Sequence, residues 1–218
     1  SNVYLDKLDK ELEQRGLRFT RYADDTMVFT KSEMAANRVM KSITDWIERK
    51  LFLKVNATKT KVVRPTRSKY LGFTFLNHGG EWKVKPTTEK KKKLKQKLSE
   101  YLKRNKAIAR PLAVTIKRVN EIVRGWINYF RIGMMKTFMQ EFGAWLRHKI
   151  RVIVIKQWKT PKTIYRNLCY LNQKNKNGFD HEAIYKVANS RLGWYRRSGM
   201  NVVNFIISPD LLENKIKD

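Results

Sequence analysis

Two adjacent carboxylates, Asp24 and Asp25, lie within the stretch RFTRYADDTMVFT at residues 18–30. The runs LRFTRY and TMVFT on either side are rich in β-forming residues, which predicts a hairpin with both acids in its turn. Carboxylate oxygens are the ligands that Mg²⁺ prefers, and Mn²⁺ accepts the same ligands. Two such ions about 4 Å apart, held by acids from separate strands, can catalyse phosphoryl transfer. The pair is therefore a candidate metal site.

A plain turn is the alternative interpretation of this pair, because Asp is a common turn former. On the dipeptide alone, that interpretation is the more frequent one. The preceding Tyr22 and Ala23, together with the β-forming runs on both sides, favour the metal site.

The charge of the chain points to a polyanionic partner. Its 218 residues include 48 Lys and Arg against 19 Asp and Glu, which gives a formal net charge of +29. Binding to RNA or DNA phosphates would relieve this self-repulsion and release counterions. A membrane surface is the weaker alternative, and we expect no membrane partner because no apolar run reaches the ~18 residues of a spanning helix. The single cysteine, Cys169, indicates a reducing compartment, and we expect a cytoplasmic, bacterial protein.

The charge is distributed unevenly and suggests a boundary near Pro86. Residues 1–82 carry 16 basic and 10 acidic side chains, whereas residues 83–218 carry 32 basic and 9 acidic ones. The first part predicts mixed α and β structure, with helices over 3–16 and 32–53 and strands over 17–22, 26–30, 60–64, 69–75 and 81–85. The second part predicts helices over 88–106, 111–133, 138–158, 162–171 and 180–194.

Basic side chains on these helices are candidate nucleic-acid contacts. A helix over 111–133 would carry an apolar stripe, including Trp126 and Phe130, that belongs to the core. Solvated helix faces are the alternative, since most charge runs are of that kind. The candidate contacts are Lys90, Lys91, Lys92, Lys93, Lys117, Arg124, Asn128, Arg131, Arg147, Arg151, Arg196 and Arg197.

Several motifs in chain order resemble one known family. Tyr-Ala-Asp-Asp on a hairpin resembles the active-site motif of reverse transcriptases, in particular those encoded by group II introns, which also act as maturases. The further matching segments are NVYLDKLDKEL, NATKTKVV, SKYLGFTF, RGWINYF, IKQWKTPKTIYRNL and ANSRLGWYRRSG. The resemblance covers essentially the whole chain, and the collinear order makes it specific.

The resemblance implies a fold class and a domain organisation. We expect an α+β protein: the C-terminal part of a right-hand polymerase palm over 1–82, with antiparallel strands and packed helices, an all-α thumb (the maturase or X domain) over 83–162, and a small, basic, helical DNA-binding segment over 163–218. The implied partners are intron RNA, an RNA template–DNA primer duplex, target DNA and dNTPs.

The resemblance also assigns roles to individual residues. Asp24 would be a metal ligand, and Asp25 a neighbour with a less strict role in the same site. Tyr22, with Ala23 beside it, would lie beneath the primer terminus. Lys59 would be a proton donor to the leaving pyrophosphate, although a solvated lysine at a strand end is an equal alternative. The segment Tyr70, Leu71 and Gly72 would support the primer end.

The chain departs from the family pattern at its start. The family needs another Asp from an earlier palm strand, fingers that cover the nucleotide, and a Gly- and Gln-containing element. We expect the chain to be the C-terminal portion of such an enzyme, inactive without the N-terminal half. The function implied is an RNA-directed DNA polymerase of a mobile group II intron that also assists splicing. The alternative is an RNA-binding maturase without polymerase activity.

Overall fold

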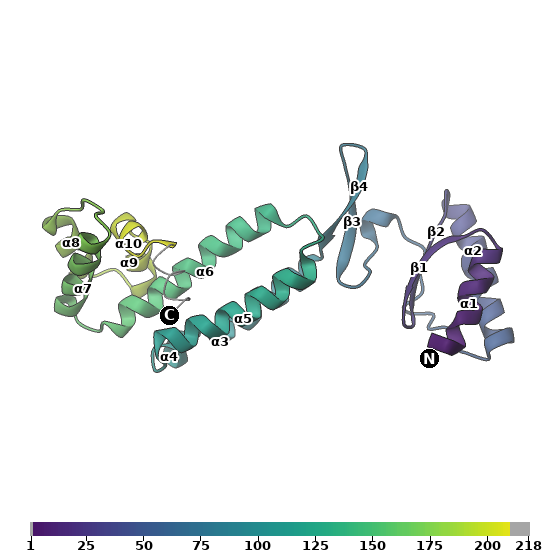
Figure 1. Ribbon diagram of the computed structural model, residues 1–218, viewed down its shortest axis with the longest axis horizontal. Coiled ribbons are helices and arrows are strands. Elements are labelled where there is room, and N and C mark those ends of the chain that lie inside the picture. Colours follow the sequence, from purple (N-terminus) through teal and green to yellow (C-terminus); the bar gives the residue numbers. More distant parts are fainter. Residues whose placement is uncertain (1, 210–218) are drawn as a thin grey trace. The chain divides into compact units, whose positions relative to one another are not determined.

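The computed structural model describes residues 2–209 of the chain. It divides into two compact units, the first ending at Thr87 and the second beginning at Thr88 (Figure 1). Together the units combine helices with two small antiparallel sheets, so the mixed α and β character predicted from the sequence is confirmed.

The first unit begins with a helix, a hairpin and a second helix. Ser32 caps the second helix, because its Oγ accepts a hydrogen bond of 3.2 Å from the amide of Ala35. Leu8, Leu12 and Leu51 form a buried core beneath the hairpin. The elements are α1 (Asn2–Gln14), β1 (Arg18–Tyr22), β2 (Asp25–Phe29), α2 (Glu33–Trp46) and the π-helical turn η1 (Ile47–Leu51).

A second hairpin completes the first unit. The short 3₁₀ turn η2 (Pro65–Arg67) precedes strands β3 (Phe73–His78) and β4 (Glu81–Pro86). Gly79 and Gly80 connect the strands with φ angles of 61° and 83°, a conformation that glycine adopts without steric cost.

One predicted strand of the first unit is wrong, and another begins later than predicted. Residues 60–64 form no strand, because no neighbouring segment of the described chain pairs with them. The predicted strand 69–75 instead starts at Phe73, since Leu71 (φ 50°) and Gly72 (φ 83°) make a tight turn. Hydrogen bonds in both directions between Tyr70 and Phe73, of 3.0 and 2.8 Å, close that turn.

The second unit starts with long amphipathic helices around one core. The buried residues Leu94, Leu98, Val119, Phe142 and Ile153 come from three of these helices. In chain order the elements are α3 (Thr88–Tyr101), α4 (Arg104–Ala107), α5 (Leu112–Phe130) and α6 (Lys136–Gln157).

The last part of the unit packs against the end of α6. Ile150 and Val154 of α6 join Ile164, Leu168 and Ile184 in a second core of this unit. The elements are α7 (Pro161–Lys174), α8 (His181–Ala188), α9 (Trp194–Ser198) and α10 (Asn201–Ile206). The predicted helix over 180–194 is too long, because α8 ends at Ala188 and a separate helix begins at Trp194.

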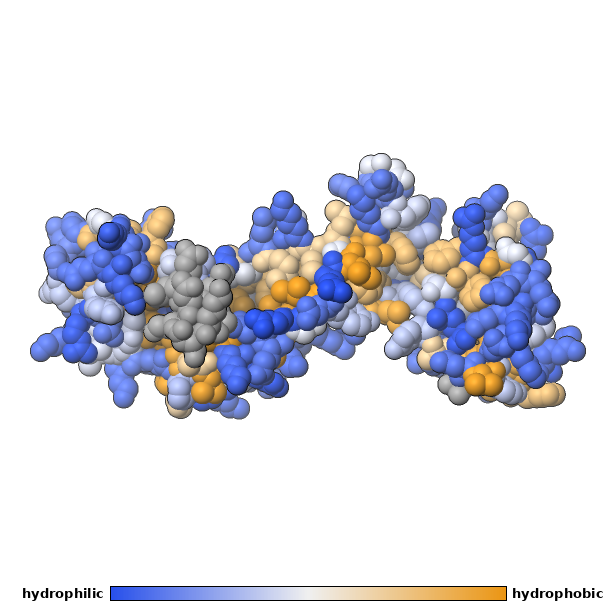
Figure 2. Space-filling view, viewed as in Figure 1, coloured by the Kyte–Doolittle hydropathy of each residue, from blue (hydrophilic) through white to orange (hydrophobic). Residues whose placement is uncertain are grey.

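None of the described helices combines the length and the apolarity that crossing a bilayer requires. Hydrophilic residues cover most of the visible face of each unit (Figure 2).

Candidate active site and nucleic-acid interface

The β1–β2 hairpin presents the paired acids at its tip. Its register pairs Tyr22 with Asp25, so the two turn residues are Ala23 and Asp24. Ala23 has a φ of 53°, as a tight two-residue connection requires. The prediction that both acids lie in the turn is therefore corrected: Asp24 lies in the turn, and Asp25 is the first residue of β2, opposite Tyr22.

The residues at the tip are open to solvent. Asp24 and Asp25 are both exposed, and Tyr22 is 66% exposed. Within residues 2–209, no ion pair or hydrogen bond engages either carboxylate. The carboxylate oxygens are therefore free to accept a cation or a donor from a ligand.

Arg21 holds the hairpin tip against α1. Its Nε donates to Asp9 Oδ1 at 2.7 Å, and its Nη2 also bonds the Asp9 carboxylate. Its Nη1 donates to the carbonyl oxygen of Ala23 at 2.8 Å and to Asn2 Oδ1 at 3.3 Å. The hydrogen bond from Arg21 holds the pKa of the Asp9 carboxyl below its usual range, and the same bond raises the pKa of Arg21.

Sequence reasoning missed Arg21 as a positioning residue, although one signal was available. Arg21 lies two residues after Phe19, so both side chains point to the same face of β1. Phe19 packs against the core on that face. A guanidinium there needs an acidic partner on the covering helix, and Asp9 is that partner.

Tyr70 is brought to the acidic hairpin from a distant part of the sequence. Its hydroxyl donates to the carbonyl oxygen of Asp25 at 3.4 Å. The rings of Phe29 and Phe75 lie edge to face, with centroids 6.1 Å apart, and join β2 to β3. The turn that holds Leu71 and Gly72 follows Tyr70 directly.

Lys59 lies in an exposed turn rather than at a strand end. Asn56 organises this turn, because its Oδ1 accepts from the amides of Thr58 and Lys59 at 3.1 Å each. In the described part of the chain, no hydrogen bond or ion pair links Lys59 to Asp24 or Asp25. The role of Lys59 therefore stays a prediction.

The predicted cations of α3 and α5 lie mostly on exposed surface. Lys90, Lys92 and Lys93 are exposed, whereas Lys91 is half-buried with its ammonium 5.1 Å from the centre of the Phe138 ring. Helix α5 and its C-cap Arg131 form an exposed polar face opposite the core, which carries Lys117, Glu121, Arg124, Asn128 and Arg131.

The predicted contact of Arg151 with nucleic acid does not agree with its position in the structure. Only 7% of this residue is exposed, and its guanidinium donates to the carbonyl oxygens of Ile207 (2.9 Å) and Asn204 (3.0 Å) and to Asn204 Oδ1 (2.9 Å). Burial lowers its pKa, and the nearby Arg147 lowers it further. Arg151 therefore fastens α10 to α6, and its donors are not available to phosphates.

The three remaining candidate arginines, Arg147, Arg196 and Arg197, differ in their exposure to solvent. Arg196 is exposed and Arg147 is half-buried. Arg197 is half-buried as well: its guanidinium donates to the carbonyl oxygen of Ser190 and lies 5.0 Å from the centre of the Trp194 ring. Burial lowers the pKa of Arg197. Arg196 is therefore the most accessible of these three.

Comparison with known families identifies the chain. Residues 1–75 match the family described as reverse transcriptase (RNA-dependent DNA polymerase), so the first unit is of the reverse transcriptase class. Residues 91–171 match the group II intron, maturase-specific domain. With both matches in this order, the chain belongs to the group II intron reverse transcriptase/maturases, and the resemblance noted in the sequence is confirmed. A search of curated proteins gives no match.

Proposed function

We propose that the chain is part of an RNA-directed DNA polymerase of a mobile group II intron, which also binds the intron RNA to assist splicing. The observation that carries the proposal is the exposed Asp24–Asp25 pair on a hairpin tip that Arg21 anchors. A pure RNA-binding surface has no need for adjacent acids, because acids repel phosphates.

The carboxylates at the tip fit a hard divalent ion. Both are exposed and free of protein partners within the described residues, and Mg²⁺ prefers oxygen ligands of this kind. When bound, Mg²⁺, or Mn²⁺ in its place, would supply positive charge for the attack of a primer 3′-hydroxyl on the α-phosphate of a dNTP. The polypeptide's contribution is positional: Arg21 fixes the turn that carries Asp24, and the strand pairing fixes Asp25 beside Tyr22.

A complete two-metal centre needs acids beyond these two. Within residues 2–209 no group of three or more His, Cys, Asp and Glu side chains could hold a metal ion. We infer that a further Asp comes from an earlier palm strand of the same enzyme, together with the fingers that would cover the nucleotide.

The remaining segments of the chain would bind nucleic acid at different places. Residues 1–82 would be palm, 83–162 thumb and 163–218 a DNA-binding segment. The exposed α5 face and the α3 lysines would follow the RNA template–DNA primer duplex or the intron RNA, with Arg196 toward target DNA. An A-form duplex would be recognised through its phosphates and 2′-hydroxyls rather than its base sequence. The single cysteine fits a reducing bacterial cytoplasm.

A maturase without polymerase activity is the second candidate. It is favoured by the match of residues 91–171 to the maturase-specific domain and by the strong positive charge of the same segment. Intron RNA binding alone would satisfy both observations.

Primer extension by this chain alone tests the need for a further acid. The assay supplies an RNA template, a DNA primer, dNTPs and Mg²⁺. We expect no extension, because Asp24 and Asp25 are only part of the ligand set that two metal ions require. Robust cDNA synthesis by the chain alone would show that the inference of a further essential Asp is wrong.

A further inference from the structure

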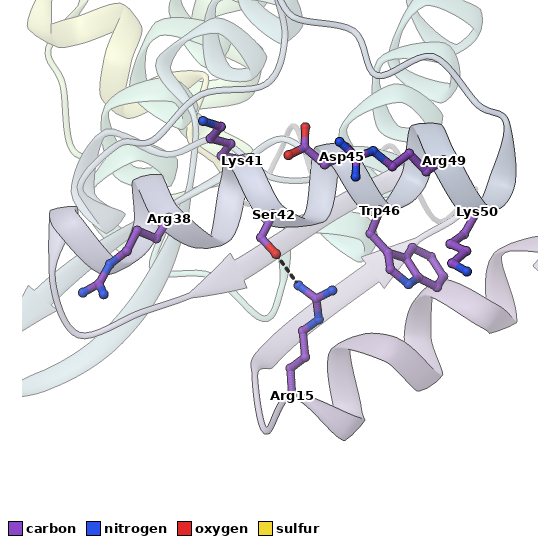
Figure 3. Close-up of a pocket in the computed structure, with 8 residues that line it drawn as sticks. All are labelled: Arg15, Arg38, Lys41, Ser42, Asp45, Trp46, Arg49 and Lys50. Carbon is purple, nitrogen blue, oxygen red and sulfur yellow. Dashed lines mark hydrogen bonds between the residues drawn. The ribbon is translucent and has the colours of Figure 1, made fainter.

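A basic groove within the first unit is lined by Arg15, which follows α1, by α2 and by the π-helical turn η1. It encloses about 470 Å³ and is open to solvent. Its size is within the roughly 300–1,000 Å³ of small-ligand sites. Its cations and its one aromatic residue are Arg15, Arg38, Lys41, Arg49, Lys50 and Trp46 (Figure 3). None of these belongs to the β1–β2 hairpin that carries Asp24 and Asp25.

The charge of the groove is unbalanced. Among the described residues, Arg38, Lys41, Arg49 and Lys50 form no ion pair, and all four are exposed. Asp45 is the single acid of the lining. A set of unpaired cations at a concave surface focuses positive potential, which favours a ligand with several negative charges.

The wall of the groove is fixed by Arg15. Its Nε donates to Glu11 Oε1 at 2.6 Å, and its Nη1 donates to Ser42 Oγ at 2.7 Å, a bond drawn in Figure 3. This contact ties the end of α1 to the middle of α2. The groove therefore has a defined width at this point instead of depending on free side chains alone.

The lining side chains follow α2 and the π-helical turn η1 that continues it, in rows four residues apart. Arg38, Ser42, Trp46 and Lys50 make one row, and Lys41 and Arg49 flank Asp45 in the next (Figure 3). At about 1.5 Å per residue, the α-helical part of the row from Arg38 to Trp46 spans roughly 12 Å, and Lys50 of η1 extends the row beyond it. This length matches a run of several phosphates rather than one isolated anion.

Trp46 adds a surface that recognises more than charge. Its indole points toward α1 within the groove (Figure 3), and the residue is half-buried at the edge of the core. Aromatic faces bind unpaired bases by stacking, in a manner that tolerates any base sequence. Bases inside a duplex offer no free face, so the indole favours single-stranded nucleic acid.

We propose that this groove binds the phosphate backbone of a single-stranded RNA segment, at a site separate from the Asp24–Asp25 tip. The choice of RNA as the ligand rests on the proposed function, in which the chain binds intron RNA. Arg38, Lys41, Arg49 and Lys50 contact successive phosphates, Arg15 and Ser42 hold the wall, and Trp46 stacks with a base.

A matched pair of triple variants tests the proposal. Arg38→Gln/Lys41→Gln/Lys50→Gln removes three groove cations, and Lys7→Gln/Arg18→Gln/Lys31→Gln removes the same residue types from exposed positions of the same unit outside the groove. The probe is a fluorescein-labelled 20-nucleotide oligo(U), and its binding to the full chain is measured by anisotropy over a salt series. Thermal unfolding of both variants checks that they fold.

We expect the groove variant to bind oligo(U) about tenfold or more weakly at low salt, with a log–log salt slope smaller by about 2, since single strands lose about 0.7 per phosphate contact. The control variant should stay much closer to the unaltered chain. Equal losses in the two variants would overturn the proposal, because the effect would then be one of net charge alone. An equal effect of the groove variant on a 20-base-pair RNA duplex would overturn the single-strand assignment.

Crosslinking locates the contact directly. With 4-thiouridine placed in the oligo(U), we expect crosslinks in the tryptic peptide 42–49, which contains Trp46. Crosslinks confined to the second unit would contradict the site. Both assays lack primer, dNTPs and metal ions, so a failure of polymerase activity leaves their result unaffected, and a negative result here leaves the polymerase proposal standing.

Discussion

At the scale of single residues, the geometry of the acidic tip depends on Arg21, whose side chain is bonded to α1 and to the turn. Arg21 ties the Ala23 carbonyl to Asp9 of α1 and so fixes the turn that presents Asp24. The ion pair is largely sheltered, with 12% of the Arg21 side chain and 25% of the Asp9 side chain exposed. It is therefore screened less than a pair on open surface.

Asp9→Asn tests this anchor. The change removes the charge-assisted pair, and we expect the first unit to lose about 1–2 kcal/mol of unfolding free energy at pH 7. The pKa of Asp9 is lowered in the folded state, so its contribution is complete above the ordinary value of 3.8 and is lost as the pH falls through the lowered value. Urea unfolding at several pH values should show the two proteins converging below pH 3.8, and a difference that stays constant there would contradict the role of the Asp9 charge.

Arg151→Gln tests whether Arg151 stabilises the packing of α10 against α6 or contacts nucleic acid. We expect a loss of about 2–3 kcal/mol in urea unfolding, because the carbonyl oxygens of Asn204 and Ile207, at the end of α10, lose their donors. The salt slope of RNA binding should not change. Arg196→Gln, at an exposed position, is the contrasting variant: it should leave stability nearly unchanged and reduce the slope by up to about 1. The opposite pattern in the two variants would show that Arg151 contacts phosphates.

The residue-level errors of the sequence analysis share one cause. Asp24 and Asp25 could be found from local sequence because the β-forming runs around them are local. The Arg21–Asp9 pair spans 12 residues and the Arg151–Ile207 bond spans 56. Nothing in a helical pattern distinguishes an arginine that caps another helix from one that faces solvent, so the sequence alone predicts a surface position for Arg151.

At the scale of elements, one face of α5 packs in the core and the opposite face is polar and exposed. Ile116, Val119 and Phe130 are buried on one side, and the polar row from Lys117 to Arg131 is exposed on the other. The 3.6-residue period predicts this division directly, and the ends of α5 and α6 lie within three residues of the ends predicted from the sequence. The strand prediction over residues 60–64 is wrong because a strand depends on pairing partners, and its own sequence does not reveal whether they are present.

A variant of the α5 face tests its contact with nucleic acid. Lys117→Gln/Arg124→Gln/Arg131→Gln should weaken binding of an RNA–DNA duplex and reduce the salt slope by about 2–3, since three phosphate contacts are lost. Glu121→Gln on the same helix is the control of opposite sign and should bind slightly more tightly. An unchanged salt slope in the triple variant would show that this face is merely solvated.

At the scale of the whole molecule, the chain joins a weakly basic first unit to a strongly basic second one. This split was visible in the sequence near Pro86, close to the unit boundary at Thr87. The two family matches fall on either side of that boundary, with reverse transcriptase before it and the maturase-specific domain after it. The Asp24–Asp25 pair thus lies in the first unit, and most of the cations lie in the second. This division is consistent with separate roles in chemistry and in binding nucleic acid.

Primer extension with the chain joined to the fingers and first palm acid of a group II intron reverse transcriptase measures whether Asp24 is a metal ligand of a polymerase centre. Asp24→Asn is compared with Asp6→Asn, an exposed aspartate whose surface ion pair with Lys10 contributes little. We predict that Asp24→Asn lowers the Mg²⁺-dependent rate at least about a hundredfold while Asp6→Asn leaves it unchanged. Extension by Asp24→Asn at the rate of the parent would contradict the account.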